Sequence, residues 1–282
     1  MPKKIVLITG CSVGGLGFAL AKAFQQAGCH VLATARNPNK VGSLADEPDI
    51  EILSLDVTSE DSIASCMSEV HKKTNGRLDI LVNNAGNSFL GPLMHAPIAE
   101  GKAMYDVNVW GALAVTQAFA PLLIQAKGTM LNISSMAGSN YMAWQGVYNS
   151  SKAAMTFLSE TWKLELEPLG VRVVTAMVGA VRTQIYAHNK MVLPQNSYYK
   201  PIEDIIGKQA RGELQEPFNE PPDVTARNIV RDTLSGRRGK IWRGGEAGAA
   251  SVGSWLLPTS FLEWFLHQKR GLYELRQFYK NK

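Results

Sequence analysis

Cysteine is scarce in this chain, and the residue spacings that accompany metal sites are missing. The 282 residues include only Cys11, Cys29 and Cys66, and no pair of them has metal-ligand spacing. An odd and sparse set of this kind is typical of reduced, structural thiols in an intracellular protein. The histidines are also scattered along the chain: His30, His71, His95, His188 and His267. We therefore expect neither a disulfide framework nor a metal site.

Long apolar runs and basic runs are missing as well. No stretch reaches the roughly 18 apolar residues of a membrane span, and the apolar run after Lys4 is too short for a signal peptide. The net charge of +5 is mild, and no basic run with interleaved aromatic residues indicates a nucleic-acid surface. We therefore expect a cytoplasmic protein without a nucleic-acid partner.

The apolar residues that are present suffice for one globular domain. They make up 45% of the chain, against 19% charged residues, so a full core can form without staples. Short β-rich runs alternate with stretches of helical periodicity, which is typical of a parallel sheet with helices on both faces. The predicted strands are 4–9, 31–35, 50–55, 78–82, 129–133 and 171–177, and the predicted helices are 18–27, 60–73, 99–125 and 147–166. The sequence thus predicts an α/β fold with a doubly wound (Rossmann) parallel sheet.

The regular alternation stops after Gly179. Residues 180–222 are polar and contain five prolines, which is typical of a binding loop or lid. A helix at 224–234 and a strand at 240–243 are expected to complete the sheet. We assign residues 1–245 to one domain, with the insertion at 180–222, and residues 246–282 to an apolar and basic C-terminal extension.

A glycine-rich loop, Thr9 to Gly17 (TGCSVGGLG), lies between the first predicted strand and the first predicted helix. Glycines there permit a tight turn and let the backbone approach a pyrophosphate at the helix N-terminus. We therefore expect a dinucleotide site in residues 1–245. Its loop residues are Gly10, Ser12, Gly15, Leu16 and Gly17. The overlapping Gly10-Cys11-Ser12-Val13-Gly14 also matches the nucleophile elbow of serine hydrolases, but no earlier strand supplies the oxyanion loop that such enzymes need.

The second predicted strand ends in Ala33-Thr34-Ala35-Arg36, where the residue that reads the adenosine ribose is expected. An acid at this point suits a free pair of ribose hydroxyls, whereas an arginine suits a 2′-phosphate. We therefore expect NADP (NADPH) as the cofactor, the alternative being an arginine that only lies on the surface. Asp56, at the end of the third strand, is expected to meet the adenine edge.

Tyr148 and Lys152 are four residues apart, so on a helix both side chains leave the same face. An ammonium beside a phenol favours the phenolate and lowers the pKa of the tyrosine from about 10. A phenol of this kind can exchange a proton with a carbonyl oxygen. Ser134 and Ser135 lie upstream, at the end of an apolar run. By itself, the spacing also fits a surface tyrosine and lysine.

Together these motifs resemble the short-chain dehydrogenase/reductase superfamily over residues 4–185. The motifs are the glycine loop, Leu55-Asp56-Val57, Asn83-Asn84-Ala85-Gly86, Asn108 in DVNVWG, Asn132-Ile133-Ser134-Ser135, Tyr148-x3-Lys152 and Val181-x-Thr183. Within the superfamily, GCSVGGLG, ATAR and IWRGG are most similar to the fungal group that includes NADPH-dependent 1-acyldihydroxyacetone-phosphate reductase and ketoreductases of secondary metabolism. Two positions depart from the family pattern: Val178 replaces a proline, and the glycine loop has one residue more, Gly14.

The resemblance implies a role for each matched residue. Ser135 would hydrogen-bond the substrate carbonyl, and Tyr148 would be the general acid in reduction. Lys152 would hold the nicotinamide ribose and lower the pKa of Tyr148. Asn108 would kink its helix and position a water that links Lys152 to solvent. The cofactor-binding residues implied outside the glycine loop and Arg36 are Asp56, Val57, Asn84, Ala85, Gly86, Tyr148, Lys152, Val181 and Thr183.

The reaction implied by the resemblance is NADPH-dependent reduction of a ketone to a secondary alcohol. Apolar and aromatic residues between Ser135 and Tyr148 and in the insertion indicate a small apolar carbonyl substrate, lipid-like or a secondary metabolite. These residues are Tyr141, Met142, Trp144, Gln145, Val147, Tyr186, Met191, Tyr198 and Tyr199. A non-catalytic NADP-binding scaffold or sensor on the same fold is the alternative. We expect a homo-oligomer.

Residues 255–282 form the second unusual feature of the sequence. An apolar band rich in tryptophan and phenylalanine is broken by Pro258. Basic residues follow it: Lys269, Arg270, Arg276, Lys280 and Lys282. Such a segment can lie in a membrane interface, which predicts peripheral contact with the endoplasmic reticulum or with lipid droplets. It could equally cover the substrate pocket or pack against a second copy of the chain.

Overall fold

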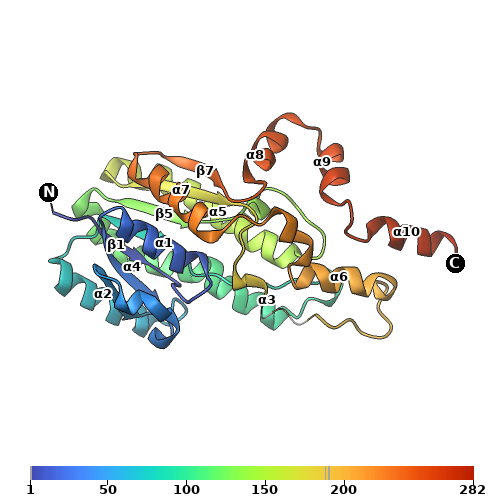
Figure 1. Ribbon diagram of the computed structural model, residues 1–282, viewed down its shortest axis with the longest axis horizontal. Coiled ribbons are helices and arrows are strands. Elements are labelled where there is room, and N and C mark those ends of the chain that lie inside the picture. The colour runs from blue at the N-terminus through green and yellow to red at the C-terminus, as the bar shows by residue number, and fades with distance from the viewer. Residues whose placement is uncertain (1, 188, 190) are drawn as a thin grey trace.

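The structure is a computed structural model that describes residues 2–187, 189 and 191–282 (Figure 1). His188, one of the scattered histidines, lies outside the described residues. The described chain contains a seven-stranded parallel sheet in the order β3-β2-β1-β4-β5-β6-β7. The strands are β1 (Ile5–Ile8), β2 (His30–Ala35), β3 (Ile50–Ser54), β4 (Ile80–Asn83), β5 (Thr129–Ile133), β6 (Arg172–Val178) and β7 (Gly239–Arg243). The doubly wound sheet and each predicted strand are thereby confirmed.

The strand order reverses between β1 and β4, next to the glycine loop. Val6 of β1 lies opposite Val31 of β2 on one side and opposite Ile80 of β4 on the other. Because the strands are parallel, their carboxyl ends meet at one edge of the sheet, and the crevice at such a reversal is where open α/β sheets bind ligands. The topology therefore gathers the ends of β1, β2, β4, β5 and β6 around one candidate site.

Two layers of helices cover the sheet. Helices α1 (Leu16–Gln26) and α7 (Pro222–Leu234) pack side by side on one face, around Phe24 and Ile229 (Figure 1). Helices α2 (Glu60–Thr74), α4 (Ala112–Ala126) and α5 (Gly146–Leu166) cover the other, around Phe119 and Met155. The strands are buried on both faces, which explains why they read as continuous apolar runs. The three cysteines are free and buried.

The helix predicted over 99–125 is present but not uniform. It begins as α3 (Ile98–Tyr105), passes through a π-helical segment, η3 (Asp106–Gly111), and continues as α4. The stretch from Ile98 to Ala126 is long and apolar enough to cross a membrane, but half of its most apolar window is buried in this structure. This finding corrects the expectation that no segment reaches the apolarity of a membrane span. Its packing against the sheet accounts for the composition.

The insertion at 180–222 is more regular than a loop. It contains α6 (Glu203–Ala210) and the short 3₁₀ helices η6 (Gln184–Tyr186), η7 (Lys200–Ile202) and η8 (Glu213–Phe218). A further 3₁₀ stretch, η1 (Pro38–Asp46), follows β2. The polar, proline-containing composition of 180–222 predicts a loop, and these elements differ from that prediction. Pro38 and Pro201 instead lie in the first turn of their helices, where the missing N–H is not needed.

The C-terminal extension folds into three helices: α8 (Ala247–Leu256), α9 (Thr259–Leu266) and α10 (Leu272–Lys280). Pro258 separates α8 from α9, as the sequence predicts. The C-terminus lies at the opposite end of the long axis from the N-terminus (Figure 1). The division into residues 1–245 and 246–282 stays a prediction.

Candidate active site

The hydroxyl of Ser134 holds strand β5 against helix α5. Its Oγ lies 2.6 Å from Thr156 Oγ1 and donates to the carbonyl oxygen of Lys152 at 3.1 Å. Ser134 is 2% exposed, and its hydroxyl is occupied by these two partners. Ser134 therefore has a structural role in joining β5 to α5.

Ser135 lies one residue further on and turns toward a different neighbour. Its Oγ donates to the carbonyl oxygen of Val178 at 3.2 Å and accepts from the N–H of Ala137 at 3.1 Å. It also lies beside the phenol of Tyr148. Val178, which replaces the usual proline, is the last residue of β6 and pairs with Arg243 of β7. With valine in place of proline at position 178, β6 therefore stays paired with β7 up to its last residue.

Tyr148 and Lys152 leave α5 on the same face, as their spacing predicts. Both are buried, with Lys152 Nζ 6.0 Å from the centroid of the Tyr148 ring. Lys152 Nζ donates to the carbonyl oxygen of Ile133, at the end of β5, at 3.0 Å. The Tyr148 ring packs in an apolar cluster with Met136 and Met142. The structure thus brings the end of β5 and the first turns of α5 to one point.

The pKa values of this pair differ from the sequence expectation. Burial raises the pKa of Tyr148 well above its ordinary value; the neighbouring phenol of Tyr186 adds to the rise, and the Ser135 hydroxyl offsets part of it. Burial lowers the pKa of Lys152 from 10.5 to about 8. The expected net lowering of the Tyr148 pKa is therefore wrong for this structure, because desolvation dominates both groups.

Asn108 lies inside the π-helical segment, so the predicted irregularity of its helix is confirmed. Its Nδ2 donates to the carbonyl oxygen of Asn87 at 3.0 Å and to Ser151 Oγ at 3.1 Å, and its Oδ1 accepts from the Asn87 N–H at 2.9 Å. Ser151 Oγ donates in turn to the Tyr148 carbonyl oxygen at 2.8 Å. Sequence reasoning missed Asn87 and Ser151, although Ser151 lies within the Tyr148-x3-Lys152 motif. A side chain at Gly86 would begin 3.2 Å from Asn108 Oδ1, so the backbone runs close to this group.

The glycine loop leads into the start of α1, which no side chain caps. The helix begins after Gly15 without a side-chain cap, and Ser12 beside it is exposed. Gly10 and Gly14 have φ of 76° and 77°, and a Cβ at Gly17 would lie 2.3 Å from the Gly10 carbonyl oxygen. Only glycine fits these three positions. A helix start without a side-chain cap, reached through glycines, suits the pyrophosphate of a dinucleotide.

Asn84 and Ala85 fix this loop to the end of β4. Thr9 Oγ1 accepts from both of their N–H groups, at 3.0 and 2.9 Å. Asn84 Nδ2 donates to the carbonyl oxygens of Thr9 and Gly10 at 2.8 and 3.0 Å. The Nδ2 group of Asn84 and the backbone N–H groups of Asn84 and Ala85 are therefore occupied in holding the glycine loop.

Arg36 is exposed at the end of β2, close to Asp56 at the end of β3. Burial would raise the pKa of the Asp56 carboxyl, but hydrogen bonds from Thr58 and the charge of Arg36 hold that pKa below its ordinary value. Asp56 Oδ1 accepts from the Thr58 N–H and hydroxyl at 3.0 and 2.8 Å. The side chains of Val57 and Leu16 belong to the apolar core, so those residues face the site through their backbone.

The segment after β6 folds back onto the glycine loop. The N–H of Gln184 donates to the Gly14 carbonyl oxygen at 3.1 Å. Val181 is buried in the core, whereas Thr183 is partly exposed at the start of η6. A cavity of about 550 Å³ lies beside the segment, with Thr183 and Tyr186 in its wall. Within the described residues, no group of three His, Cys, Asp or Glu side chains is placed to hold a metal ion.

The C-terminal helices pack against the residues around Tyr148. Ala250 of α8 and Trp242 pack against the apolar cluster that holds the Tyr148 ring. The Trp144 indole donates to the Arg270 carbonyl oxygen at 2.8 Å, and the Ala143 N–H lies 3.2 Å from His267 Nε2. Among membrane contact, a second copy of the chain and a cover over the pocket, the cover therefore fits the side of the extension that faces Tyr148.

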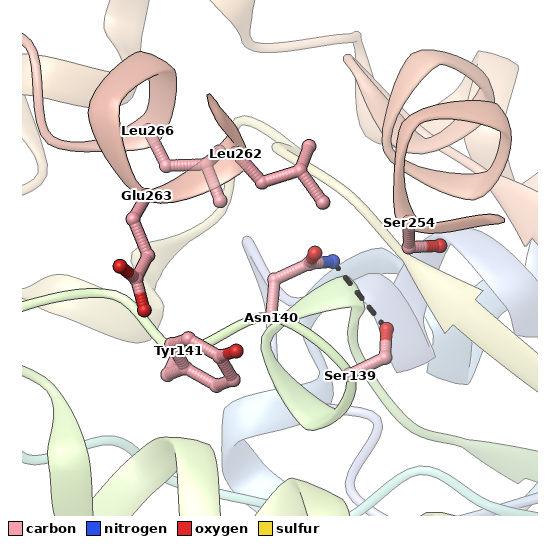
Figure 2. A pocket seen from close by; sticks show the side chains of 7 residues that line it. All are labelled: Ser139, Asn140, Tyr141, Ser254, Leu262, Glu263 and Leu266. Atoms are coloured by element: carbon pink, nitrogen blue, oxygen red, sulfur yellow. Dashed lines mark hydrogen bonds between the residues drawn. The ribbon is translucent and has the colours of Figure 1, made fainter. Parts of the chain in front are cut away.

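Part of the expected pocket wall does face this cover. Met142, Trp144 and Gln145 are buried, while Tyr141 is 60% exposed. A cavity of about 110 Å³ lies between Tyr141 and the α9 residue Leu266, whose side chains are drawn in Figure 2. In the same view Asn140 Nδ2 donates to Ser139 Oγ at 3.4 Å. The cavity lies between the loop after β5 and the C-terminal helices, and the helices contribute Ser254 and Glu263 as well as two leucines.

Comparisons with known proteins agree with this arrangement. A family model described as short chain dehydrogenase matches residues 4–191. Among curated relatives, the short-chain dehydrogenase cctT of Talaromyces islandicus is 49% identical over 259 residues, which cover 91% of this chain and 90% of that protein. The NADPH-dependent 1-acyldihydroxyacetone phosphate reductase of Schizosaccharomyces pombe is 37% identical over 271 residues, with coverage of 91% and 90%. Among solved structures, a short-chain dehydrogenase from Streptomyces avermitilis superposes with a TM-score of 0.78 at 30% identity, covering 95% of this chain and 98% of that one.

Proposed function

Because the chain belongs to the short-chain dehydrogenase family, we propose that it is an NADPH-dependent reductase that converts a ketone into a secondary alcohol. The observation that supports this most directly is the convergence of Ser135, Tyr148 and Lys152 at the end of β5. A hydroxyl, a phenol and an ammonium in this arrangement can bind a carbonyl oxygen and give it a proton. The nucleophile-elbow interpretation of Gly10 to Gly14 is abandoned, since the family match spans this loop.

Tyr148 is the general acid of the reduction. NADPH, when bound, supplies the hydride. Ser135 donates a hydrogen bond to the substrate carbonyl oxygen, and Tyr148 transfers its phenolic proton to that oxygen. The raised pKa of Tyr148 keeps its phenol protonated at neutral pH, which is the form that reduction requires. The same group acts as the base in oxidation only after it loses that proton.

Lys152, whose Nζ lies over the Tyr148 ring, supports the proton transfer from Tyr148. With a pKa of about 8 it is mostly charged at neutral pH, so it stabilises the phenolate that proton transfer leaves on Tyr148. It also holds the nicotinamide ribose. Asn108 keeps α5 in place through Ser151 and positions the water that connects Lys152 to solvent.

The cofactor site extends from the glycine loop to Arg36. Arg36 binds the 2′-phosphate of NADP, since it is exposed at the end of β2 and a guanidinium can bind phosphate through two hydrogen bonds. The uncapped start of α1 binds the pyrophosphate. The other proposed contacts are Gly10, Ser12, Gly15, Leu16, Gly17, Asp56, Val57, Asn84, Ala85, Gly86, Val181 and Thr183.

A non-catalytic NADP-binding scaffold is the second candidate, and the buried lysine argues against it. Lys152 is 5% exposed and its lowered pKa means that its charge destabilises the fold. A protein that only binds NADP gains nothing from this cost next to a buried phenol. The apolar cluster around Tyr148, with Met136, Met142 and Trp242, supports an apolar body for the substrate.

The cofactor assignment and the activity can be tested together. The chain should oxidise NADPH in the presence of at least one ketone from a panel of long-chain ketones, acyl-dihydroxyacetone phosphates and polycyclic ketones. NADH should be used less well. Arg36→Glu should lower kcat/KM for NADPH by about 10- to 100-fold, the range expected for a lost charge-assisted hydrogen bond, and should leave NADH unchanged or improved. The measurement is the absorbance of the reduced nicotinamide with each cofactor.

Lys72→Glu is the matched control, because Lys72 is also an exposed cation and lies in the last turn of α2. It makes the same charge change and should alter neither cofactor. Equal losses for NADPH and NADH in Arg36→Glu, or no loss at all, would contradict the role of Arg36. No NADPH consumption with any ketone would contradict the proposed activity.

The outer side of the C-terminal helices supports peripheral contact with a phospholipid surface. Trp255, Leu256, Trp264 and Phe265 are 88%, 65%, 62% and 57% exposed, so α8 and α9 present a large apolar surface to solvent. The basic flank expected from the sequence needs one correction. Arg270 turns inward, toward Gln209 and Met142, which leaves the other four basic residues to face anionic lipid. Localisation in the cytoplasm, at the endoplasmic reticulum or on lipid droplets stays a prediction.

Removing the two exposed indoles should weaken this contact. We expect the purified chain to co-sediment with phosphatidylcholine vesicles that contain phosphatidylserine, and Trp255→Ser with Trp264→Ser to reduce binding by about tenfold or more because two large apolar groups are lost. Trp110→Ser is the control, since Trp110 is 56% exposed on η3, away from the C-terminal helices. If the double variant binds vesicles as well as the Trp110 variant does, the contact lies elsewhere or does not exist.

Assembly into a homo-oligomer is supported by a second exposed apolar surface. Phe157 and Leu164 on α5 are 76% and 70% exposed, and η3 with Trp110 packs beside α5. Isolated apolar side chains at a surface are ordinary, but a group on neighbouring helices is typical of a protein interface.

A further inference from the structure

Three segments from different parts of the chain meet around the guanidinium of Arg270. Arg270 lies between α9 and α10, Gln209 ends α6 of the insertion, and Met142 lies in the loop between β5 and α5. Arg270 Nη1 donates to Gln209 Oε1 at 2.5 Å, Nη2 lies 3.4 Å from Met142 Sδ, and Nε donates to the Leu266 carbonyl oxygen at 2.6 Å. Each partner is uncharged.

The charge of Arg270 has no countercharge at contact distance. No carboxylate of the described residues lies within 4.0 Å of its guanidinium. Burial lowers the pKa of Arg270, and the carboxyl of Glu246 acts on it only from a distance. A desolvated cation without an anion is costly, and a thioether is a weak acceptor for one of its N–H groups. The guanidinium of Arg270 therefore has no negatively charged group in contact with it.

Gln209 adds a second donor that lacks an acceptor. A guanidinium can only donate, so the amide oxygen of Gln209 must face Arg270 and its Nε2 must point away. Gln209 is completely buried, and its Nε2 has no hydrogen-bond partner among the described residues. Buried amide donors are rarely left unsatisfied in native proteins. Arg270 and Gln209 together form a donor pair that no group of the described chain completes.

The donor pair lies close to the proposed catalytic phenol. Met142, which touches Arg270, packs in the same apolar cluster as Tyr148, and its carbonyl oxygen accepts from Asn149 Nδ2 at 3.0 Å. Burial raises the pKa of Tyr186, the phenol next to Tyr148, and the charge of Arg270 opposes that rise. Leu266, whose carbonyl oxygen holds Arg270, also lines the cavity in Figure 2.

We propose that Arg270 and Gln209 form a binding site for an anionic group, a carboxylate or a phosphate, on the ketone substrate. The inference rests on the proposed reductase function and narrows its substrate class. The ketone has an apolar body, which the Met136 and Met142 cluster accommodates, and an acidic end that reaches the donor pair. The C-terminal extension then contributes to specificity as well as covering the site.

Matched substrate pairs test this proposal on the full-length enzyme. One pair is a medium-chain β-keto acid and its methyl ester; the other is an acyl-dihydroxyacetone phosphate and the same compound without phosphate. Arg270→Gln should raise KM for the charged members by about 10- to 100-fold and change the neutral members by less than about threefold. Arg270→Lys should recover part of the loss, since it restores the charge but not the fork geometry. A loss in only one pair assigns the anion as carboxylate or as phosphate.

Two controls separate recognition from docking of the C-terminal helices. His267→Ala removes the contact to the Ala143 N–H without changing charge at the donor pair, and should affect charged and neutral ketones equally. Arg276→Gln removes an exposed cation on α10 and should affect neither. Equal losses on charged and neutral ketones in Arg270→Gln, or no loss, would overturn the proposal.

A binding measurement distinguishes failure of this site from failure of the proposed activity. Decyl phosphate and decanoate should bind the wild-type chain in calorimetry more tightly than decanol, and Arg270→Gln should remove that preference. If no ketone is reduced but the preference is found, the anion site stands and the reductase function fails. If ketones are reduced but wild type shows no preference for an anion, the anion site fails and the reductase function stands.

Discussion

Replacing Tyr148 with phenylalanine should lower kcat by about 1,000-fold and leave NADPH affinity within about threefold of wild type. A general acid typically contributes about 100- to 10,000-fold to rate. The substitution removes only the hydroxyl, since the ring remains packed between Met136 and Met142 in its buried cluster. The rate is measured by NADPH oxidation with a saturating ketone, and affinity by titration of NADPH fluorescence.

Tyr186→Phe is the matched control for this change. It removes the same atom from the phenol beside Tyr148, and that phenol contributes to the raised pKa of Tyr148. We expect kcat to change by less than about tenfold, because Tyr186 transfers no proton to the substrate. If Tyr148→Phe keeps more than about a tenth of the wild-type rate, Tyr148 is not the general acid. A wild-type chain that binds NADPH but reduces no ketone would favour the scaffold alternative.

Replacing Lys152 with methionine should remove activity and make the protein more stable at neutral pH. Burial lowers the pKa of Lys152 from 10.5 to about 8 in the folded state. A difference of that size corresponds to about 3 kcal/mol of destabilisation. Loss of the hydrogen bond to the Ile133 carbonyl oxygen returns about 1 kcal/mol. We therefore expect the free energy of unfolding at pH 7 to rise by about 2 kcal/mol, and kcat to fall at least about 100-fold.

The gain in the free energy of unfolding expected for Lys152→Met should depend on pH, and the pKa of Lys152 gives the direction. Between pH 8 and about 10.4 the unfolded chain binds more protons at Lys152 than the folded chain does, so the stability of wild type rises with pH in this window. The destabilising contribution is complete below pH 8 and fades toward pH 10. The advantage of Lys152→Met in urea unfolding should therefore be largest near pH 7 and shrink by pH 10.

Lys72→Met provides the reference for this experiment. Lys72 is exposed on α2, so its replacement should change neither the free energy of unfolding nor its pH dependence relative to wild type. A Lys152→Met protein that is less stable than wild type at pH 7 would contradict the assignment of a desolvated, destabilising ammonium. A gain that does not depend on pH would show that better packing, rather than the charge, is responsible.

The sheet, the glycine loop and the shared helix face of Tyr148 and Lys152 could be predicted because their signals are local. Strands such as β1 and β6 are buried on both faces and read as continuous apolar runs. The positive φ of Gly10 and the close approach at Gly17 leave no residue but glycine, so the loop is visible in the sequence. The spacing of Tyr148 and Lys152 likewise follows from one turn of helix.

The parts that could not be predicted depend on contacts between distant segments. The pKa of Tyr148 moves upward because of burial, which its helix alone does not determine. Arg270 looked like one of several basic residues after an apolar band, and only the folded chain turns it toward Gln209, 61 residues away. The position of Asn84 in its motif suggested a cofactor contact, whereas its amide is occupied by the carbonyl oxygens of the glycine loop.

The insertion and the C-terminal extension share a small core of their own. Ile202 and Ile206 from the insertion are buried with Trp144 in a cluster separate from the two that flank the sheet. Leu272 and Leu275 of α10 are partly buried and pack against this cluster. Elements held by a small separate core open at a lower free energy than the central sheet and tend to open together. Substrate entry and product release can therefore proceed by cooperative loosening of α6 and α10, while the glycine loop and the strands that hold the cofactor stay closed.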